Sequence, residues 1–275
     1  MIFIYLWICT QIIIELLPIS SSSHLLLLET LYKRFFSFDI KTYFCDKKID
    51  IQTFYYFLHI PTFLIILFFF YNQWISFVYD GSSIFLKPVI WVFCVDAITC
   101  FFYVGLRYSK ISFPLLVGFI ITGLSLITTI GCGYGKPIMH WNFIDAVFFG
   151  LAQSVALLPG ISRLAITCSM GCWLGFSLID SFCLSWLVQA PLMALAIIKS
   201  IGDMWSLPKD RQLLNMPIAA TMLIGSALSW YILQIVVAMA HKNMWHLFGF
   251  YMIVPCIIWT KKGGALCLEC FLKKQ

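Results

Sequence analysis

A carboxylate, a proline, four serines and a histidine lie close together near the N-terminus, between Glu15 and His24. Pro18 cannot continue a helix, because its ring removes a backbone N–H and clashes with the preceding turn. The serines at 20–23 follow directly, and serine is preferred where a new helix begins. The free N–H groups and the positive dipole end of such a helix favour an anion. The stretch therefore indicates an anion site beside hydroxyl groups that could act as nucleophiles.

Gln11, Glu15 and His24 flank the serines, and the Glu15 carboxylate and the His24 imidazole are groups that can transfer protons. Gln11 and Glu15 are four residues apart, so their side chains share one face of the helix that leads into the break. His24 lies about one turn beyond the serines. A structural interpretation stays open for each group. Serines can serve close helix packing, Glu15 can be a structural hydrogen-bonding group, and His24 can be a core histidine.

A second break of the same kind occurs in the sequence P-G-I-S-R-L-A-I-T at 159–167. The pair Pro159 and Gly160 interrupts a helix, and Ser162 stands where the next helix starts. Thr167, one turn later, adds a further hydroxyl group. This break therefore predicts a second helix N-terminus that could face an anion.

Arg163 follows Ser162 and is the single basic residue at membrane depth. A charged side chain is costly there and marks a functional site by default. The guanidinium fork suits phosphate, because it can contact two oxygens at once. Glu15 from the first break could pair with Arg163 when the site is empty. The alternative is a shallow break from which Arg163 reaches the membrane interface.

The composition places both breaks in a membrane protein. The chain has 275 residues, of which 61% are hydrophobic and 11% charged, with a mean hydropathy of +0.94. A soluble domain carries about 25% charged residues. The apolar runs are continuous rather than alternating, which excludes a transmembrane barrel and leaves helices. We therefore predict an all-α polytopic membrane protein with about six transmembrane helices, at 51–71, 85–106, 112–131, 181–201, 215–240 and 244–260.

The two breaks predict an inverted repeat. "ELLPISS" aligns with "ALLPGIS" 141 residues later without gaps. Residues 1–131 form the first repeat and residues 142–260 the second, each a broken, re-entrant helix pair followed by three spans. Residues 261–275 are a cytoplasmic tail of the same integral membrane domain. An odd number of spans between the breaks inverts the second repeat, and such repeats build binding sites near the midplane.

The charge distribution predicts the orientation in the membrane. Of the 18 Lys and Arg residues, all but four fall on the face that carries both termini. The exceptions are Arg163 and, on the opposite face, Lys87, Lys136 and Lys242. The positive-inside rule makes the first face cytoplasmic. The net charge of +6 is explained by this asymmetry and by attraction to anionic membrane lipids, so no nucleic-acid partner is expected.

Three aspartates in apolar surroundings have simpler interpretations. Asp96 lies within the predicted span 85–106 and favours a polar contact between helices. Asp145 and Asp180 lie near helix ends, where capping or interfacial roles are expected.

Both breaks resemble the signatures of the undecaprenyl-diphosphate phosphatase family, the bacitracin-resistance membrane phosphatases. The sequence Q-x-x-x-E-L-L-P-I-S-S-S-S-H at 11–24 resembles that family's (E/Q)-x-x-x-E followed by P-[IV]-S-S-[ST]-G-H. The sequence at 159–167 resembles its P-G-x-S-R-S-G-x-T. The similarity continues through the lead-in at 145–163 and the following span at 181–191, and it covers nearly the whole chain.

The resemblance implies a phosphatase of the bacterial plasma (inner) membrane that hydrolyses undecaprenyl diphosphate to undecaprenyl phosphate and phosphate. Such an enzyme recycles the lipid carrier for peptidoglycan synthesis and confers resistance to bacitracin. The implied partners are a polyprenyl diphosphate lipid and the surrounding membrane lipids, with a homodimer possible. Two other functions stay open: a polyprenyl-phosphate flippase or transporter, and a degenerate, non-catalytic membrane homologue.

The resemblance also implies residue roles. By position, Ser21 is the nucleophile, His24 a second acid or base, and Glu15 with Gln11 assists proton transfer or holds a divalent cation, Mg²⁺ or Ca²⁺. The residues alone do not rank Ser21 above its neighbours. The implied phosphate-binding residues are Ser20, Ser22, Ser162, Arg163 and Thr167.

The chain departs from the family pattern at four positions. Ser23 stands where the family has glycine, and Leu164 and Ala165 stand where it has serine and glycine. Met252 stands where an arginine usually follows tyrosine. These departures concern catalytic rate and substrate fit more than the fold.

Overall fold

The computed structural model describes residues 2–40, 42, 44, 50–79, 86–109, 113–131, 135–206 and 216–260, and nearly all of them are helical. Among these residues there is no strand, only an isolated bridge between Lys136 and Phe176. The all-α prediction is therefore confirmed. The elements are α1 (Ile2–Ile14), α2 (Ser21–Phe36), α4 (Ile51–Phe57), α5 (His59–Tyr79), α6 (Leu86–Ser109), α7 (Leu115–Ile127), the 3₁₀ turn η1 (Ile138–His140), α8 (Phe143–Val155), α9 (Arg163–Trp173), α10 (Leu178–Trp205), α11 (Met216–His241), α12 (His246–Tyr251) and α13 (Ile253–Thr260).

Four helical stretches in the described part of the chain are long and apolar enough to cross a membrane: Ile51–Ser76, Pro88–Ser109, Leu178–Trp205 and Met216–His241. Each coincides with a predicted span. The other two predicted spans are shorter helices. α7 has 13 residues, which rise about 20 Å, whereas the hydrocarbon core is roughly 30 Å thick. The span expected at 244–260 is divided into α12 and α13 at Met252.

Both predicted breaks are present. The first separates α1 from α2 at residues 15–20, and the second separates α8 from α9 at residues 156–162. Ser162 caps α9 as expected, because its Oγ accepts a hydrogen bond from the Ala165 N–H at 3.2 Å. Ser20 occupies the same position before α2, but its hydroxyl donates to Ser23 Oγ at 2.9 Å instead of capping the backbone.

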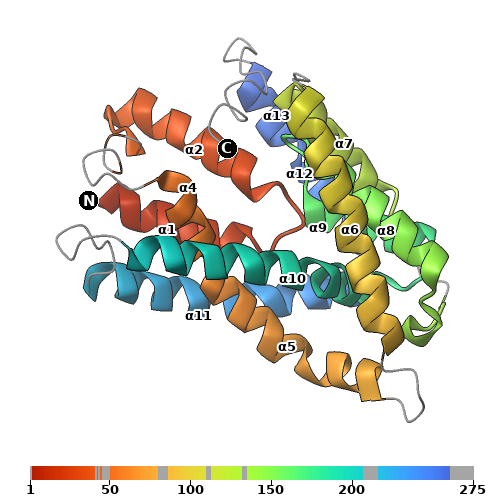
Figure 1. Cartoon of the computed structure of the whole chain (residues 1–275). Coiled ribbons are helices and arrows are strands. Elements are labelled where there is room, and N and C mark those ends of the chain that lie inside the picture. Colours follow the sequence, from red (N-terminus) through yellow and green to blue (C-terminus); the bar gives the residue numbers. More distant parts are fainter. Residues whose placement is uncertain are drawn as a thin grey trace.

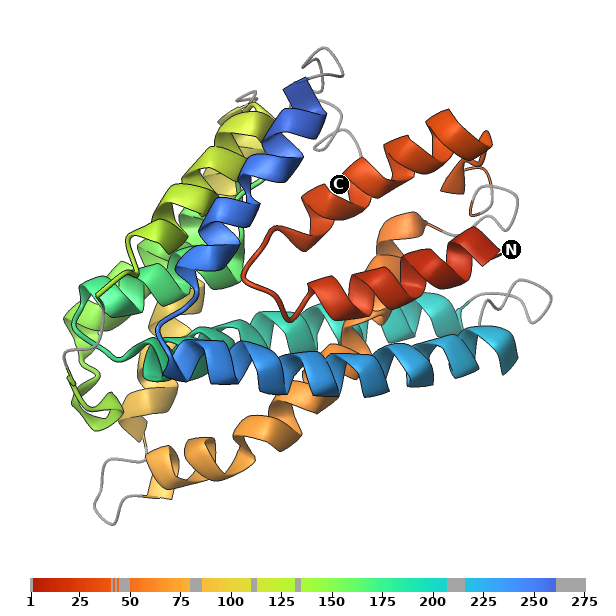
Figure 2. The ribbon, with the colours of Figure 1, turned by 180° about the vertical axis from the view of Figure 1, so that it is seen from behind.

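The helices form two groups that meet at the breaks (Figures 1 and 2). On one side α1 packs along α11, and α10 packs on α4 and α5; on the other, α6 packs along α8, and α7 crosses α12. α10 also packs against α9, so it joins the groups. The largest core cluster contains Phe182 and Trp186 of α10, Phe70 of α5 and Leu16 of the first break. The first break is therefore anchored by Leu16 in the largest core cluster of the described residues.

The expectations for the three aspartates are confirmed. Gln153 of α8 donates to Asp96 of α6 at 3.1 Å, which is an interhelical polar contact. Asp145 completes a capping box at the start of α8. Asp180 accepts a hydrogen bond from Ser177 Oγ at 2.7 Å at the start of α10.

Several predictions fall outside the described residues. They concern the tail 261–275, with its four lysines, and six further basic residues on which the predicted orientation depends: Lys41, Lys47, Lys48, Lys110, Lys209 and Arg211. The orientation and the division into two repeats stay predictions.

Candidate active site

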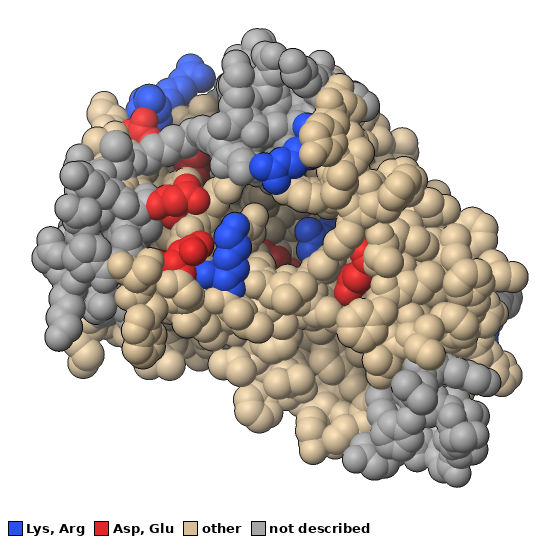
Figure 3. All heavy atoms as spheres, viewed as in Figure 1, with Lys and Arg blue, Asp and Glu red and all other residues tan. Residues whose placement is uncertain are grey.

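A cavity of about 380 Å³ lies between the two breaks. Acidic and basic side chains gather around a hollow on the face shown in Figure 3. Six of the predicted site residues line the cavity: Glu15, Ser20, Ser21, Ser22, Ser162 and Arg163. The structure therefore brings together residues that are about 140 positions apart in the sequence.

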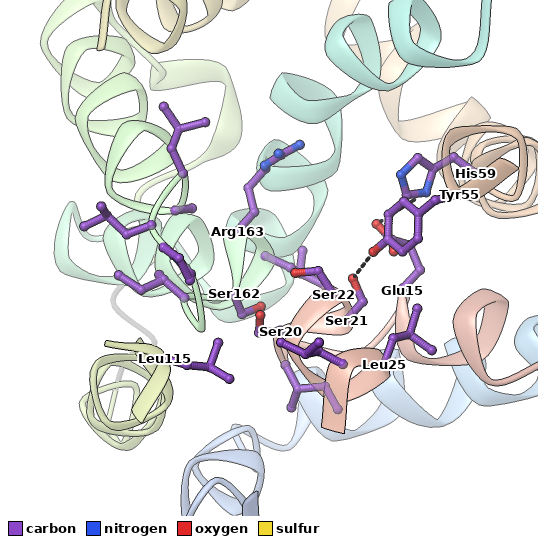
Figure 4. Close-up of a pocket in the computed structure, with 18 of the residues that line it drawn as sticks. Glu15, Ser20, Ser21, Ser22, Leu25, Tyr55, His59, Leu115, Ser162 and Arg163 are labelled. Atoms are coloured by element: carbon purple, nitrogen blue, oxygen red, sulfur yellow. Dashed lines mark hydrogen bonds and ion pairs between the residues drawn. The ribbon is translucent and has the colours of Figure 1, made fainter. Parts of the chain in front are cut away.

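Arg163 projects into the cavity from one side, while Glu15, Tyr55 and His59 line the opposite side (Figure 4). Ser21 and Ser22 lie between these two walls. An arrangement with a guanidinium opposite a carboxylate and hydroxyls between them can hold a phosphate group next to a nucleophile.

The hydroxyls of the first break point in different directions. Ser20 is 3% exposed, and its Oγ donates to Ser23. Ser21 begins α2, and its Oγ lies 3.4 Å from the Tyr55 hydroxyl of α4. Ser21 is therefore paired with the cavity wall rather than with another serine of the run.

The Glu15 carboxylate has two polar neighbours, Gln11 and His59. Its Oε2 accepts a hydrogen bond from Gln11 Nε2 at 2.9 Å, and its Oε1 lies 3.7 Å from His59 Nδ1. The predicted Gln11–Glu15 contact across one helical turn is thus observed. The expected pairing of Glu15 with Arg163 in an empty site is wrong. Glu15 is turned towards α1 and α5, and no ion pair to Arg163 exists among the described residues.

His59 was not identified from the sequence, although it lines the cavity and is 9% exposed. Pro61 provides no N–H for the Phe57 carbonyl, and the helix is interrupted at Leu58, so that His59 begins α5. The ring packs edge-on against Tyr55, with centroids 5.3 Å apart. The available signal was a histidine two residues before a proline in an apolar span, because a proline inside an apolar run also marks the two breaks.

His24 does not line the cavity. Its Nδ1 lies 2.7 Å from the Ser20 carbonyl oxygen, and its ring stacks on Tyr251 at 5.8 Å. Phe119 of α7 packs against the ring edge. The geometry thus gives His24 the position of a core histidine, and the imidazole that faces the cavity is that of His59.

Thr167 is also remote from the cavity lining. It is fully buried, and its hydroxyl donates to the carbonyl of Arg163, one turn earlier in α9, at 2.8 Å. Ser162 and Arg163 both line the cavity, whereas Thr167 is buried in the protein interior and does not line it. A direct phosphate contact from Thr167 has no support in this geometry.

Arg163 begins α9, and its Nε is buried without a hydrogen-bond partner. In the described segments no carboxylate lies within ion-pair distance of its guanidinium. An unpaired guanidinium in a partly apolar cavity is costly unless an anion meets it. The arrangement therefore favours an anionic ligand.

The four departures from the family pattern occupy different environments. Leu164 lines the cavity, and Ala165 is fully buried behind it. Ser23 is helical with an ordinary negative φ, so the position needs no glycine. Met252 is 1% exposed and does not line the cavity, but it packs in a core cluster with Ile19 and Leu115, which do.

Comparison with known proteins gives one family and several relatives. Residues 9–258 match the family model described as "Bacitracin resistance protein BacA". A protein named undecaprenyl-diphosphatase from Elusimicrobium minutum is 25% identical over 255 residues, which cover 89% of this chain and 91% of the relative. One of the same name from Desulforudis audaxviator is 24% identical over 250 residues, covering 87% and 89%. Another from Campylobacter concisus is 31% identical over 218 residues, covering 72% and 76%.

Proposed function

The chain belongs to the family of the bacitracin resistance protein BacA, and we propose that it is an integral membrane phosphatase acting on undecaprenyl diphosphate. The relatives named undecaprenyl-diphosphatase support this assignment. The observation that carries it is the shared cavity, in which Ser21 and Glu15 of one break face Arg163 of the other. The products would be undecaprenyl phosphate and inorganic phosphate.

The reaction follows from the positions of these groups. The diphosphate lies between Arg163 and the N-terminus of α2, where a guanidinium and free N–H groups stabilise the negative charge. Ser21 Oγ attacks the terminal phosphorus, and the bond from that phosphorus to the bridging oxygen breaks. Undecaprenyl phosphate leaves, and water then hydrolyses the phosphoserine to release phosphate.

Glu15 is the group that accepts the proton in this scheme. It lines the cavity, accepts a hydrogen bond from Gln11 and lies 3.7 Å from His59 Nδ1. A carboxylate in this position can serve as a general base. Direct attack by a water molecule activated at Glu15 is the second possible mechanism, and it requires no covalent intermediate.

A divalent cation, Mg²⁺ or Ca²⁺, is implied by the family resemblance. The described residues contain no cluster of three or more His, Cys, Asp or Glu that could hold a metal. However, Gln11 Oε1 is buried without a hydrogen-bond partner next to the Glu15 carboxylate. Mg²⁺ is commonly bound by one or two carboxylates together with substrate phosphates. Glu15 and Gln11 therefore fit a partial site that the diphosphate completes, and the cation would neutralise phosphate charge.

The inverted repeat is a further part of the proposal. In the described residues of each half, two short helices around a break are followed by two long apolar stretches and a shorter apolar one: α4–α5, α6 and α7 in the first half, and α10, α11 and α12–α13 in the second. α1 of the first half packs on α11, and its counterpart α8 packs on α6, the counterpart of α11. α5 likewise packs on its counterpart α10, and α7 on α12. A two-fold relation between the halves would produce these pairings.

The resulting physiological proposal is recycling of the lipid carrier for peptidoglycan synthesis in the bacterial inner membrane, with resistance to bacitracin as a consequence.

The proposed activity is tested by measuring phosphate release from undecaprenyl diphosphate by the purified full chain in detergent, with and without a chelator. We expect release that the chelator abolishes and that added Mg²⁺ or Ca²⁺ restores. Translocation of a polyprenyl phosphate across vesicles without phosphate release would instead identify a transporter. The absence of both phosphate release and translocation would identify a non-catalytic homologue.

A further inference from the structure

α7 packs directly against the backbone of the second break. Gly160 has a φ of +86°, and a Cβ at this position would clash with the Leu115 carbonyl oxygen. A Cβ at Gly118 would clash with the Pro159 carbonyl oxygen. The two backbones therefore touch at a pair of glycines, and the path of the break depends directly on α7.

Thr122, one turn after Gly118, completes this contact. Its hydroxyl donates to the Gly160 carbonyl oxygen at 3.0 Å and accepts from the Ser162 N–H at 2.9 Å. Thr122 is fully buried. A single hydroxyl thus satisfies two backbone groups of the break, one on each side of Ile161, directly before Arg163.

This use of a hydroxyl distinguishes Thr122 from the rest of α7 and the turn that follows it. The hydroxyls of Ser125, Thr128 and Thr129 donate to carbonyls three residues earlier in the same segment. These local bonds do not reach the break. Thr128 Oγ1 also accepts a hydrogen bond from Trp173 Nε1 at 3.1 Å, but Trp173 is the last residue of α9, at the end away from Arg163. Only Thr122, among the described hydroxyls of 115–129, donates to the break.

We propose that Thr122 is a positioning residue for the phosphate site. Its two hydrogen bonds hold residues 160–162 so that Ser162 and Arg163 face the cavity. The inference rests on the proposed phosphatase function, because it assigns Thr122 a role in binding and stabilising the transferred phosphate. Thr122 does not line the cavity and acts only through the break.

The test compares Thr122→Val, Thr122→Ser and the matched control Thr129→Val in the full-length protein. Valine keeps the shape and removes the hydroxyl, and serine restores the hydroxyl. Thr129 is also fully buried, but within the described part of the chain its hydroxyl bonds only to the Leu126 carbonyl. We expect Thr122→Val to lower kcat for phosphate release by about 10- to 100-fold, because small displacements of positioning groups have effects of this size. Thr122→Ser should stay within about threefold of wild type, and Thr129→Val should be unchanged.

A second measurement is independent of activity. Hydrogen–deuterium exchange of the peptide that covers residues 156–166 should accelerate in Thr122→Val and not in Thr129→Val. Wild-type kcat in Thr122→Val, equal losses in Thr122→Val and Thr129→Val, or unchanged exchange in Thr122→Val would each overturn the inference. If the wild-type protein releases no phosphate, the proposed function fails, and the exchange comparison still decides whether Thr122 holds the break.

Discussion

At the residue scale, the choice of nucleophile rests on the family resemblance and on the directions of the Ser20 and Ser21 hydroxyls. Ser20 is bonded to Ser23, whereas Ser21 faces Tyr55 across the cavity. We predict that Ser21→Ala reduces phosphate release by at least about 10²-fold while the protein keeps its Tm, because the covalent step loses its nucleophile. Steady-state turnover and thermal unfolding of the single serine variants test this. Near-full turnover in Ser21→Ala, with loss in Ser20→Ala or Ser22→Ala, would place the nucleophile elsewhere in the run.

The two histidines should behave differently when each is replaced by leucine. His59 lies beside Glu15 in the cavity wall, with its Nδ1 3.7 Å from Glu15 Oε1 and without a hydrogen bond among the described residues. His59→Leu should therefore lower kcat by roughly 10-fold or more without lowering Tm. His24→Leu should lower Tm by several degrees, because it removes the buried contact with the Ser20 carbonyl oxygen and the stacking on Tyr251. If His24→Leu is stable but loses as much kcat as His59→Leu, the result would support His24 as an acid–base residue.

At the element scale, local rules predicted the breaks but not the contacts between elements. Pro18 and Pro159 end helices through their own missing N–H groups, so the sequence alone locates both interruptions. The approach of His59 to Glu15 depends on how α5 packs beside the first break, and no local pattern encodes that distance. The direction of His24 and Thr167 was missed for the same reason. Each residue is at the expected place in the sequence but on a helix face turned away from the cavity.

The contact between α7 and α12 is an element-scale contact that one added methyl group can disturb. A Cβ at Gly249 would lie 2.7 Å from the Gly123 carbonyl oxygen and 2.8 Å from Ile127 Cγ1. We predict that Gly249→Ala destabilises the protein by about 1–3 kcal/mol, as overpacking does. Gly105→Ala in α6 is the control, because nothing lies within 4 Å of its added Cβ. Its Tm should be unchanged or slightly raised. Equal Tm values for Gly249→Ala and wild type in thermal unfolding would show that the helices separate at this point without cost.

At the scale of the whole molecule, the orientation of the protein in the membrane stays a prediction from the charge distribution, because many of the basic residues lie outside the described part of the structure. We predict that the C-terminal end of α10 is cytoplasmic and the C-terminal end of α11 is on the opposite face. Trp205 and Asn243 are exposed at these ends. In a variant without the native cysteines, Trp205→Cys should resist a membrane-impermeant reagent in intact cells, and Asn243→Cys should react. The reverse pattern would refute the orientation.

The central claim is that two breaks, one from each half of the chain, form a single diphosphate site. Arg163 tests it most directly, because it is the charged group that the second break contributes to the cavity and it makes no ion pair among the described residues. The decisive measurement is phosphate release from undecaprenyl diphosphate by Arg163→Ala and Arg163→Lys, with Tm recorded for both. We predict that both variants fold with the wild-type Tm, that Arg163→Ala is inactive, and that Arg163→Lys keeps only a small fraction of kcat, since lysine lacks the planar fork. A stable Arg163→Ala protein with wild-type turnover would contradict the account.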